Sequence, residues 1–261
     1  MSKVKTNFII KSDIVKIRGN TYITCNADEK YNTNTEKKDK VNLFTQFFIS
    51  DDKERFNENL FCLHKNIKNH VIDRIFLLNE RIYTAKEMRL KKIPSKVIQI
   101  NMRKRLMFSD VFKAIRRFRI KGYLILSNLD IFFNETLKNI YLTSIKEKRI
   151  VYSQLRYEYD NPLKRLKSCS QDTWIYHSGH PVRNINSFNY YFGQPGCDTR
   201  TNYLLWEQGF KCHNHPSVIN CIHVHKDKKR NYKLKHIKKK LLQVFPVYRI
   251  GDRENHEQSS P

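Results

Sequence analysis

The stretch Tyr123–Phe133, with the sequence YLILSNLDIFF, holds the pattern that decides the fold. It opens with an apolar, β-favouring run, which is typical of a strand buried on both faces of a parallel sheet. Asn128 and Asp130 follow directly, and further apolar residues come after them. Ligands of open α/β sheets bind at the carboxyl ends of the strands, so we expect these two polar residues at a ligand-binding edge.

Outward from this stretch, strand-like and helix-like segments alternate along the chain. Val41–Ile49 (VNLFTQFFI) is a nearly continuous β-branched and aromatic run that predicts a buried strand. Phe56, Leu60, Leu63 and Ile67 then recur at helical spacing. Further strands are predicted over 73–78, 96–100, 150–155 and 217–224, and further helices over 107–119, 136–146 and 198–208. This alternation predicts an α/β fold with a mostly parallel central sheet and helices on both faces.

Two end segments flank the central domain, which is predicted over residues 41–232. Residues 1–40 are expected to form a small β-hairpin, from Asn7–Ile10 and Thr21–Thr24, followed by a polar linker from residue 26 onward. Residues 233–261 are expected to form a basic helical tail.

The composition bounds the partners and the compartment. The 261 residues carry 50 Lys and Arg against 25 Asp and Glu, a formal net charge of +25. This predicts attraction to nucleic acid, a membrane face or a phosphate-bearing small molecule. The alternative is that an AT-rich coding sequence, which tends to yield many Lys, Asn and Ile residues, accounts for most of the surface lysines. No apolar run approaches the roughly 20 residues that span a membrane, and no secretory signal opens the chain. The six cysteines form no CxxC pair, so we expect reduced thiols in a cytoplasmic protein.

Acidic residues are the first candidates for chemistry. Asn128 and Asp130 offer oxygen ligands that suit Mg²⁺ or Mn²⁺ on a diphosphate, although such a pair can also cap the next helix. Asp198 follows a glycine-rich loop and opens a predicted helix, where it could act as a general base or only as the N-cap. Asp172 beside Trp174 suits a sugar, because aromatic faces stack on sugar C–H groups and a carboxylate accepts from hydroxyls; a core strand is the alternative.

Late histidines are the second set of candidates. His223 and His225 alternate on a predicted strand, so both imidazoles could face one side and ligate a metal. The neighbouring cysteines and histidines invite a structural zinc site, but their spacings match none of the usual zinc patterns. Those neighbours are Cys212, His213, His215 and Cys221.

Basic residues are the third set. Arg105 lies near the start of a predicted helix that carries Asp110, a placement that suits phosphate. The segment Lys226–Lys240 could bind nucleic acid or an anionic surface, or it could form a solvated helix face.

The succession of these motifs resembles the GT-A fold glycosyltransferases, in particular small stand-alone enzymes of large DNA viruses and bacteria. The resemblance covers about residues 41–232. It is carried by the segments 105–110 (RLMFSD), 127–137 (SNLDIFFNETL), 171–176 (QDTWIY), 192–200 (FGQPGCDTR) and 223–225 (HVH).

The resemblance implies a metal and donor site. By it, Asn128-Leu-Asp130 looks like the D-x-D motif that binds the metal–diphosphate of a nucleotide sugar, with Asn in place of the first acid. His223 or His225 would complete the coordination of Mn²⁺ or Mg²⁺. Arg105 and Asp110 would face the donor, and Phe48 to Ser50 would border its base.

The resemblance also implies an activity. Asp198 looks like the catalytic base of inverting members, and Asp172 with Trp174 would line the acceptor or sugar side. We therefore expect an enzyme that moves a sugar from a nucleotide-diphosphate sugar to a glycan or protein-linked hydroxyl. By this resemblance the protein would work in the cytoplasm, the host's cytoplasm if it is viral. The competing hypothesis is a non-enzymatic nucleic-acid-binding protein that uses the basic surface.

Overall fold

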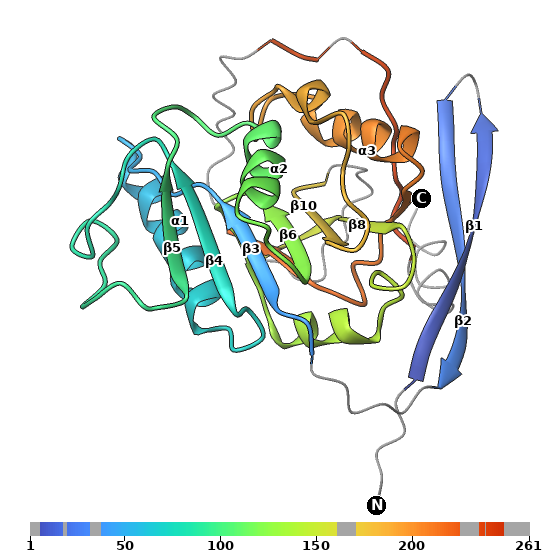
Figure 1. The fold of residues 1–261 in the computed structure, drawn as a ribbon, viewed down its shortest axis with the longest axis horizontal. Coiled ribbons are helices and arrows are strands. Elements are labelled where there is room, and N and C mark those ends of the chain that lie inside the picture. Colours follow the sequence, from blue (N-terminus) through green and yellow to red (C-terminus); the bar gives the residue numbers. More distant parts are fainter. Residues whose placement is uncertain are drawn as a thin grey trace, which may run out of the picture.

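A computed structural model describes residues 6–17, 20–31, 38–160, 171–224, 235–237 and 239–247. Its centre is a seven-stranded sheet with the order β11-β8-β10-β6-β3-β4-β5 (Figure 1). The bounds are β3 Val41–Thr45, β4 Arg74–Asn79, β5 Val97–Asn101, β6 Tyr123–Ser127, β8 Ile150–Gln154, β10 Thr173–His177 and β11 Lys211–His213. Strands β5, β4, β3 and β6 run parallel and β11 is parallel to β8, whereas β10 is antiparallel to β6 and β8. The mostly parallel central sheet is confirmed.

Helices cover both faces of this sheet, as the alternation predicted. The α-helices are α1 Lys53–Lys68, α2 Phe108–Arg117 and α3 Cys197–Glu207. Leu124 of β6 packs in the core layer that contains Phe108 of α2 and Leu204 of α3. The next residue, Ile125, packs in the opposite layer, which contains Leu60 of α1. Successive side chains of one strand thus fill two separate hydrophobic layers, as period-two geometry requires.

A smaller sheet extends the carboxyl edge of the large one. It consists of β7 Ile131–Phe133, β12 Cys221–His223 and β9 Arg156–Glu158, in the order β7-β12-β9. β7 follows β6 and β9 follows β8, so both leave the carboxyl ends of central strands. In the register of the sheet, His223 lies opposite Ile131 on one side and Glu158 on the other. This pairing gathers residues from three distant parts of the chain.

Two predicted elements have different bounds or geometry. The strand expected over 41–49 ends at Thr45, because the backbone N–H of Phe47 leaves the ladder and donates to the Asn79 side chain at 2.8 Å. The helix expected over 136–146 is instead a 3₁₀ helix, η1, over Glu135–Leu142, and the Asn134 side chain caps its start.

The predicted helical tail is wrong for the part that the structure describes. Residues 235–237 and 239–247 contain no helix and run as irregular chain along α3 (Figure 1). Leu242 and Val244 are each 1% exposed and join the core layer of α2 and α3. The backbone N–H of Leu242 donates to the carbonyl of Thr199, so the tail is bonded to the helix. Apolar residues within the basic sequence, rather than helical periodicity, determine this path.

The N-terminal hairpin is confirmed and is longer than expected. β1 Thr6–Ile17 pairs antiparallel with β2 Asn20–Tyr31 (Figure 1). The first residues of the expected polar linker therefore belong to β2. Among the helices of the described ranges, none has the length and hydropathy needed to cross a bilayer.

Gly122, immediately before β6, occupies a position that only glycine fits. Its φ is +106°, and a Cβ atom there would overlap the carbonyl oxygen of Lys40. Its N–H donates to the Ser178 side chain at 2.9 Å. The close approach lets the start of β3 and the start of β6 lie side by side.

We expect Gly122→Ala to lower the free energy of unfolding by about 2–4 kcal/mol, because it adds left-handed strain and a backbone overlap. Urea unfolding measures the loss. The matched control is Gly193→Ala, where φ is also positive (+68°). A Cβ atom added at Gly193 would meet no described atom beyond its chain neighbours within 4 Å. That variant should lose only about 1 kcal/mol. Equal losses of unfolding free energy in Gly122→Ala and Gly193→Ala would show that the close approach of Gly122 to Lys40 does not require glycine.

Candidate functional site

Asp130 is the centre of a buried ionic cluster at the carboxyl end of β6. The residue is 7% exposed. Its Oδ2 accepts from Arg55 Nη2 of α1 at 2.6 Å and lies 3.1 Å from His223 Nε2. Burial opposes ionisation of this carboxyl, but the hydrogen bonds and charges of His223 and Arg55 outweigh it and hold its pKa well below the usual range. Asp130 is therefore an anion at neutral pH.

His223 lies between two carboxylates. Its Nε2 faces Asp130 and its Nδ1 faces Glu158 Oε2 at 2.8 Å. Burial alone would lower the pKa of His223, but the hydrogen bonds to the two acids outweigh it and raise the pKa to about 9. The imidazole is thus a cation that donates through both nitrogens. Both ring nitrogens face carboxylates in this arrangement, and the metal-ligating role expected for His223 stays a prediction.

Asp172 and Asn128 form the second half of the cluster. Asn128 Nδ2 donates to Asp172 Oδ1 at 2.7 Å, and Arg156 Nη1 donates to Asp172 Oδ2 at 2.5 Å. Arg156 Nε also donates to Glu158 at 3.1 Å, which links the two halves. Sequence analysis predicted Asn128, Asp130, Asp172 and His223, and the structure brings these four together.

Sequence analysis missed Arg55, Arg156 and Glu158, which complete the cluster. Arg55 lies in the first turn of α1, and Arg156 and Glu158 lie in the short strand β9. Each is an ordinary charged residue in its own segment. Their position along the chain could have identified them, because α1 and β9 each follow a central strand and so begin at the ligand-binding edge of the sheet.

Asp130→Asn should destabilise the protein by about 3 kcal/mol, because it leaves the buried His223 cation and the partly exposed Arg55 cation without their shared anion. Chemical unfolding at pH 7 measures this. The control is Glu87→Gln, which breaks the exposed Arg81–Glu87 pair and should have little effect. A tolerated Asp130→Asn would show that the cluster does not depend on this charge.

The predicted donor-side residues each make contacts of their own. Arg105 is exposed and donates to the carbonyl of Phe192 at 3.0 Å. Asp110 is buried and accepts from Lys104 Nζ at 2.9 Å and from the backbone N–H of Met107 at 3.0 Å. It therefore stabilises the start of α2, and it does not pair with Arg105. Phe48 is 37% exposed and Ser50 is partly exposed, in the loop between β3 and α1.

Trp174 is part of the core, contrary to the expectation that it lines a sugar site. It is 1% exposed, and its Nε1 donates to Asn202 Oδ1 of α3 at 3.0 Å. Its ring meets Phe108 edge-on with centroids 5.0 Å apart. The alternating pattern of β10 turns this aromatic side chain into the layer below α2 and α3.

Asp198 lies in the first turn of α3 and is partly buried. The N-cap is Gly196, so the N-cap alternative for Asp198 is wrong. Burial raises the pKa of the neighbouring Cys197 thiol, and the charges of Asp198 and Asp172 add to this effect. Asn202 of α3 donates to Gln171 Oε1 at 2.8 Å, so α3 contacts the residue that precedes Asp172.

One group of this site, the Asp130 carboxylate, suits a divalent cation. Asp130 Oδ1 is buried and has no hydrogen-bond partner among the described residues. Among those residues, no group of three or more His, Cys, Asp or Glu could hold a metal ion. His225 lies outside the described residues. One free carboxylate oxygen suits an ion that takes its other ligands from phosphate and water, as Mg²⁺ commonly does.

The cysteine and histidine residues considered for zinc are separate core residues. Cys212 and Cys221 are buried thiols, and His213 and His215 pack with the ring of Tyr152. Burial lowers the pKa of His213 to about 3 and that of His215 to about 4. Both imidazoles are therefore neutral in the folded protein at pH 7.

This pair predicts acid sensitivity. Unfolded histidines titrate near pH 6.5, so below that pH the unfolded chain binds protons that the folded chain excludes. Stability should fall by roughly 1–2 kcal/mol per histidine between pH 6.5 and 5. Urea unfolding across this range should show a weaker pH dependence in His213→Phe. Exposed His70→Gln is the control and should keep the wild-type dependence.

Comparisons with known proteins give structural similarities only. No protein-family model matches the chain, and no curated protein matches it. Among solved structures, the chain is similar to a putative nucleotide-diphospho-sugar transferase from Desulfovibrio desulfuricans G20, with 8% identity and a TM-score of 0.45 over 73% of this chain and 83% of that one. It is also similar to the mannosyltransferase PcManGT from Pyrobaculum calidifontis, solved with GDP-Man and Mn²⁺, with 11% identity and a TM-score of 0.45. That match covers 75% of this chain and 59% of the mannosyltransferase. At these values neither similarity assigns an activity.

Proposed function

We propose that this protein is a glycosyltransferase that moves a sugar from a nucleotide-diphosphate sugar to a hydroxyl of a glycan or protein-linked acceptor. The observation that carries the proposal is the buried Asp130 at the carboxyl end of β6, whose Oδ1 has no hydrogen-bond partner among the described residues, with Arg55 and Arg156 in the same cluster. The motif succession around it resembles the GT-A glycosyltransferases. One of the solved neighbours is named a putative nucleotide-diphospho-sugar transferase, and that name is consistent with the proposal.

Charge compensation is the first part of the proposed mechanism. A leaving nucleoside diphosphate accumulates negative charge, which arginines and a divalent cation can stabilise. Mn²⁺ or Mg²⁺ would be held by Asp130 through Oδ1, and when bound would supply Lewis-acid stabilisation of the diphosphate. Arg55 and Arg156 would supply positive charge at the same edge of the sheet. His225 remains a proposed further ligand, and Arg105, Asp110, Phe48 and Ser50 remain proposed for the donor side.

Proton transfer is the second part. Asp198 would accept the proton of the acceptor hydroxyl, and the resulting oxygen nucleophile would form the new bond to the anomeric carbon. The bond from that carbon to the diphosphate oxygen breaks on the opposite face, which gives an inverting reaction. The partly buried position of Asp198 in the first turn of α3 supports this role. Asp172 would stay bonded to Asn128 and Arg156 and position the acceptor side.

Asp198→Asn should lower sugar transfer by about 10²–10⁴-fold and leave donor binding unchanged, because only the proton acceptor is lost. Thermal shifts with nucleoside diphosphates and nucleotide sugars, with and without Mn²⁺, measure donor binding. The control is the exposed Asp51→Asn, which should change neither.

Two results would contradict the proposal. Equal loss of transfer and donor binding in Asp198→Asn would exclude the base role. No shift with any nucleotide, together with a large and strongly salt-dependent shift with DNA or RNA, would favour the nucleic-acid-binding alternative that the +25 charge suggests.

A further inference from the structure

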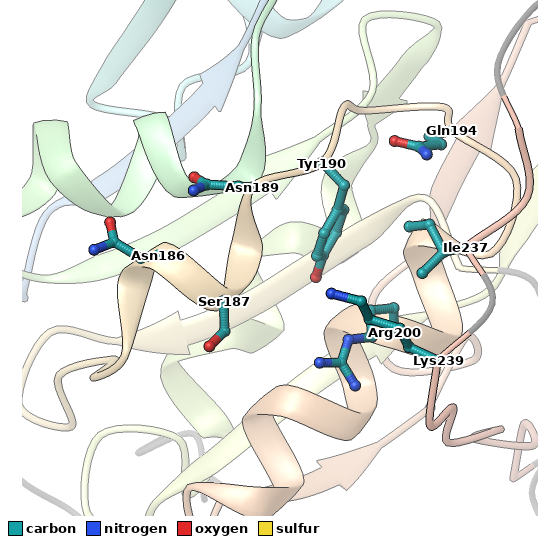
Figure 2. Close-up of a pocket in the computed structure, with 8 residues that line it drawn as sticks. All are labelled: Asn186, Ser187, Asn189, Tyr190, Gln194, Arg200, Ile237 and Lys239. Atoms are coloured by element: carbon teal, nitrogen blue, oxygen red, sulfur yellow. The ribbon is translucent and has the colours of Figure 1, made fainter.

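A pocket lies on the α3 side of the molecule, where four segments meet. Its volume is about 340 Å³. The segments are the 3₁₀ helix Ile185–Phe188 (η2) with the residues after it, the loop before α3, α3 itself and the tail. The lining residues are Asn186, Ser187, Asn189, Tyr190, Gln194, Arg200, Ile237 and Lys239 (Figure 2).

The lining of this pocket is positively charged. Arg200 comes from α3 and Lys239 from the tail, and no Asp or Glu is among the eight lining residues. Figure 2 shows the Lys239 side chain reaching toward the Tyr190 hydroxyl, whereas the Arg200 guanidinium is directed away from that hydroxyl. Two cations that share a hollow repel each other, and an anion between them removes that repulsion.

Arg200 is held in place and still has a donor to offer. Its Nη1 donates to the carbonyl of Lys240 at 3.0 Å, and its guanidinium lies 5.3 Å from the ring centre of Tyr203. Its Nε is buried and has no hydrogen-bond partner among the described residues. A buried N–H without an acceptor is costly, and an oxyanion would satisfy it.

Neutral polar groups complete the lining. Asn186, Ser187 and Asn189 are exposed and can donate to a ligand. The Tyr190 hydroxyl already bonds to Thr201 Oγ1 at 2.9 Å, so it forms a fixed wall. The pocket thus combines the Arg200 guanidinium, which is bonded to the tail, with the exposed Lys239 amine and several neutral donors. This combination suits a small anionic group with hydroxyls around it.

We propose that this pocket binds an oxyanion, a phosphate, sulfate or carboxylate, carried on a small polar molecule. The site stands on its own residues and does not depend on the proposed function. If the proposed function is also correct, an acidic acceptor is the source of the oxyanion to test first; Arg200 and Asp198 are two residues apart in α3, so their side chains leave the helix on different faces.

Calorimetric titration of the full chain with inorganic phosphate at low salt tests the site. Arg200→Gln and Lys239→Glu should each weaken binding at least tenfold. Lys113→Glu on the exposed face of α2 changes the net charge as Lys239→Glu does, and it should weaken binding less than twofold. Because Lys239 is exposed, its variant keeps the test valid even if Arg200→Gln fails to fold.

Sugar probes then identify the source of the oxyanion. Glucose 1-phosphate and glucuronate compare a phosphate ester with a carboxylate, and glucose is the neutral reference. Saturable binding of either anion that depends on Arg200 supports the site. Absence of saturable anion binding, equal binding of glucose, or equal weakening by Lys113→Glu would overturn it. Failure of the proposed function would appear instead as loss of nucleotide binding, with phosphate binding unchanged.

Discussion

The charge on Asp130 is the constraint on which the site depends. It is buried at the end of a central strand, and it bonds at once to Arg55 of α1 and His223 of β12. Without these cations burial would favour the neutral acid, and without the acid the two cations would repel each other. The ion cluster therefore connects the large sheet, the small sheet and α1. Its geometry requires that all three be in place.

The same cluster relates the structure to the proposed chemistry. Positive charge is supplied by Arg55 and Arg156, whose donors already bond to carboxylates. A diphosphate or a divalent ion would have to exchange with these bonds rather than enter an empty cage. Exchange of one set of charge-assisted bonds for another costs little net energy, which is useful for a site that must bind and release an anion. Asp130 Oδ1 differs from the other carboxylate oxygens named here, because it has no hydrogen-bond partner among the described residues.

The sequence predicted the sheet well because its signals there are local. The apolar run of β6, its polar end and the helical spacing of α1 each lie within one segment, and the structure contains all three. Asn128, Asp130, Asp172 and His223 were found in the same way. Arg55 and Glu158 were missed because their contacts depend on strand pairing across the chain. Trp174 was misplaced because both faces of β10 are buried, so its aromatic side chain belongs to the core. The tail was misread because Leu242 and Val244 pack by shape and not by period.

The path of the tail has a consequence for the order of events during synthesis. Leu242 and Val244 fill a layer whose other members, Phe108 and Leu204 among them, are made earlier by the ribosome. That layer stays open to water until residue 244 has left the exit tunnel. The layer beneath α1, which holds Leu60 and Ile125, needs no residue later than Cys221 among those described in it. Vectorial synthesis thus favours completion of the α1 side first, with the α3 side finished last.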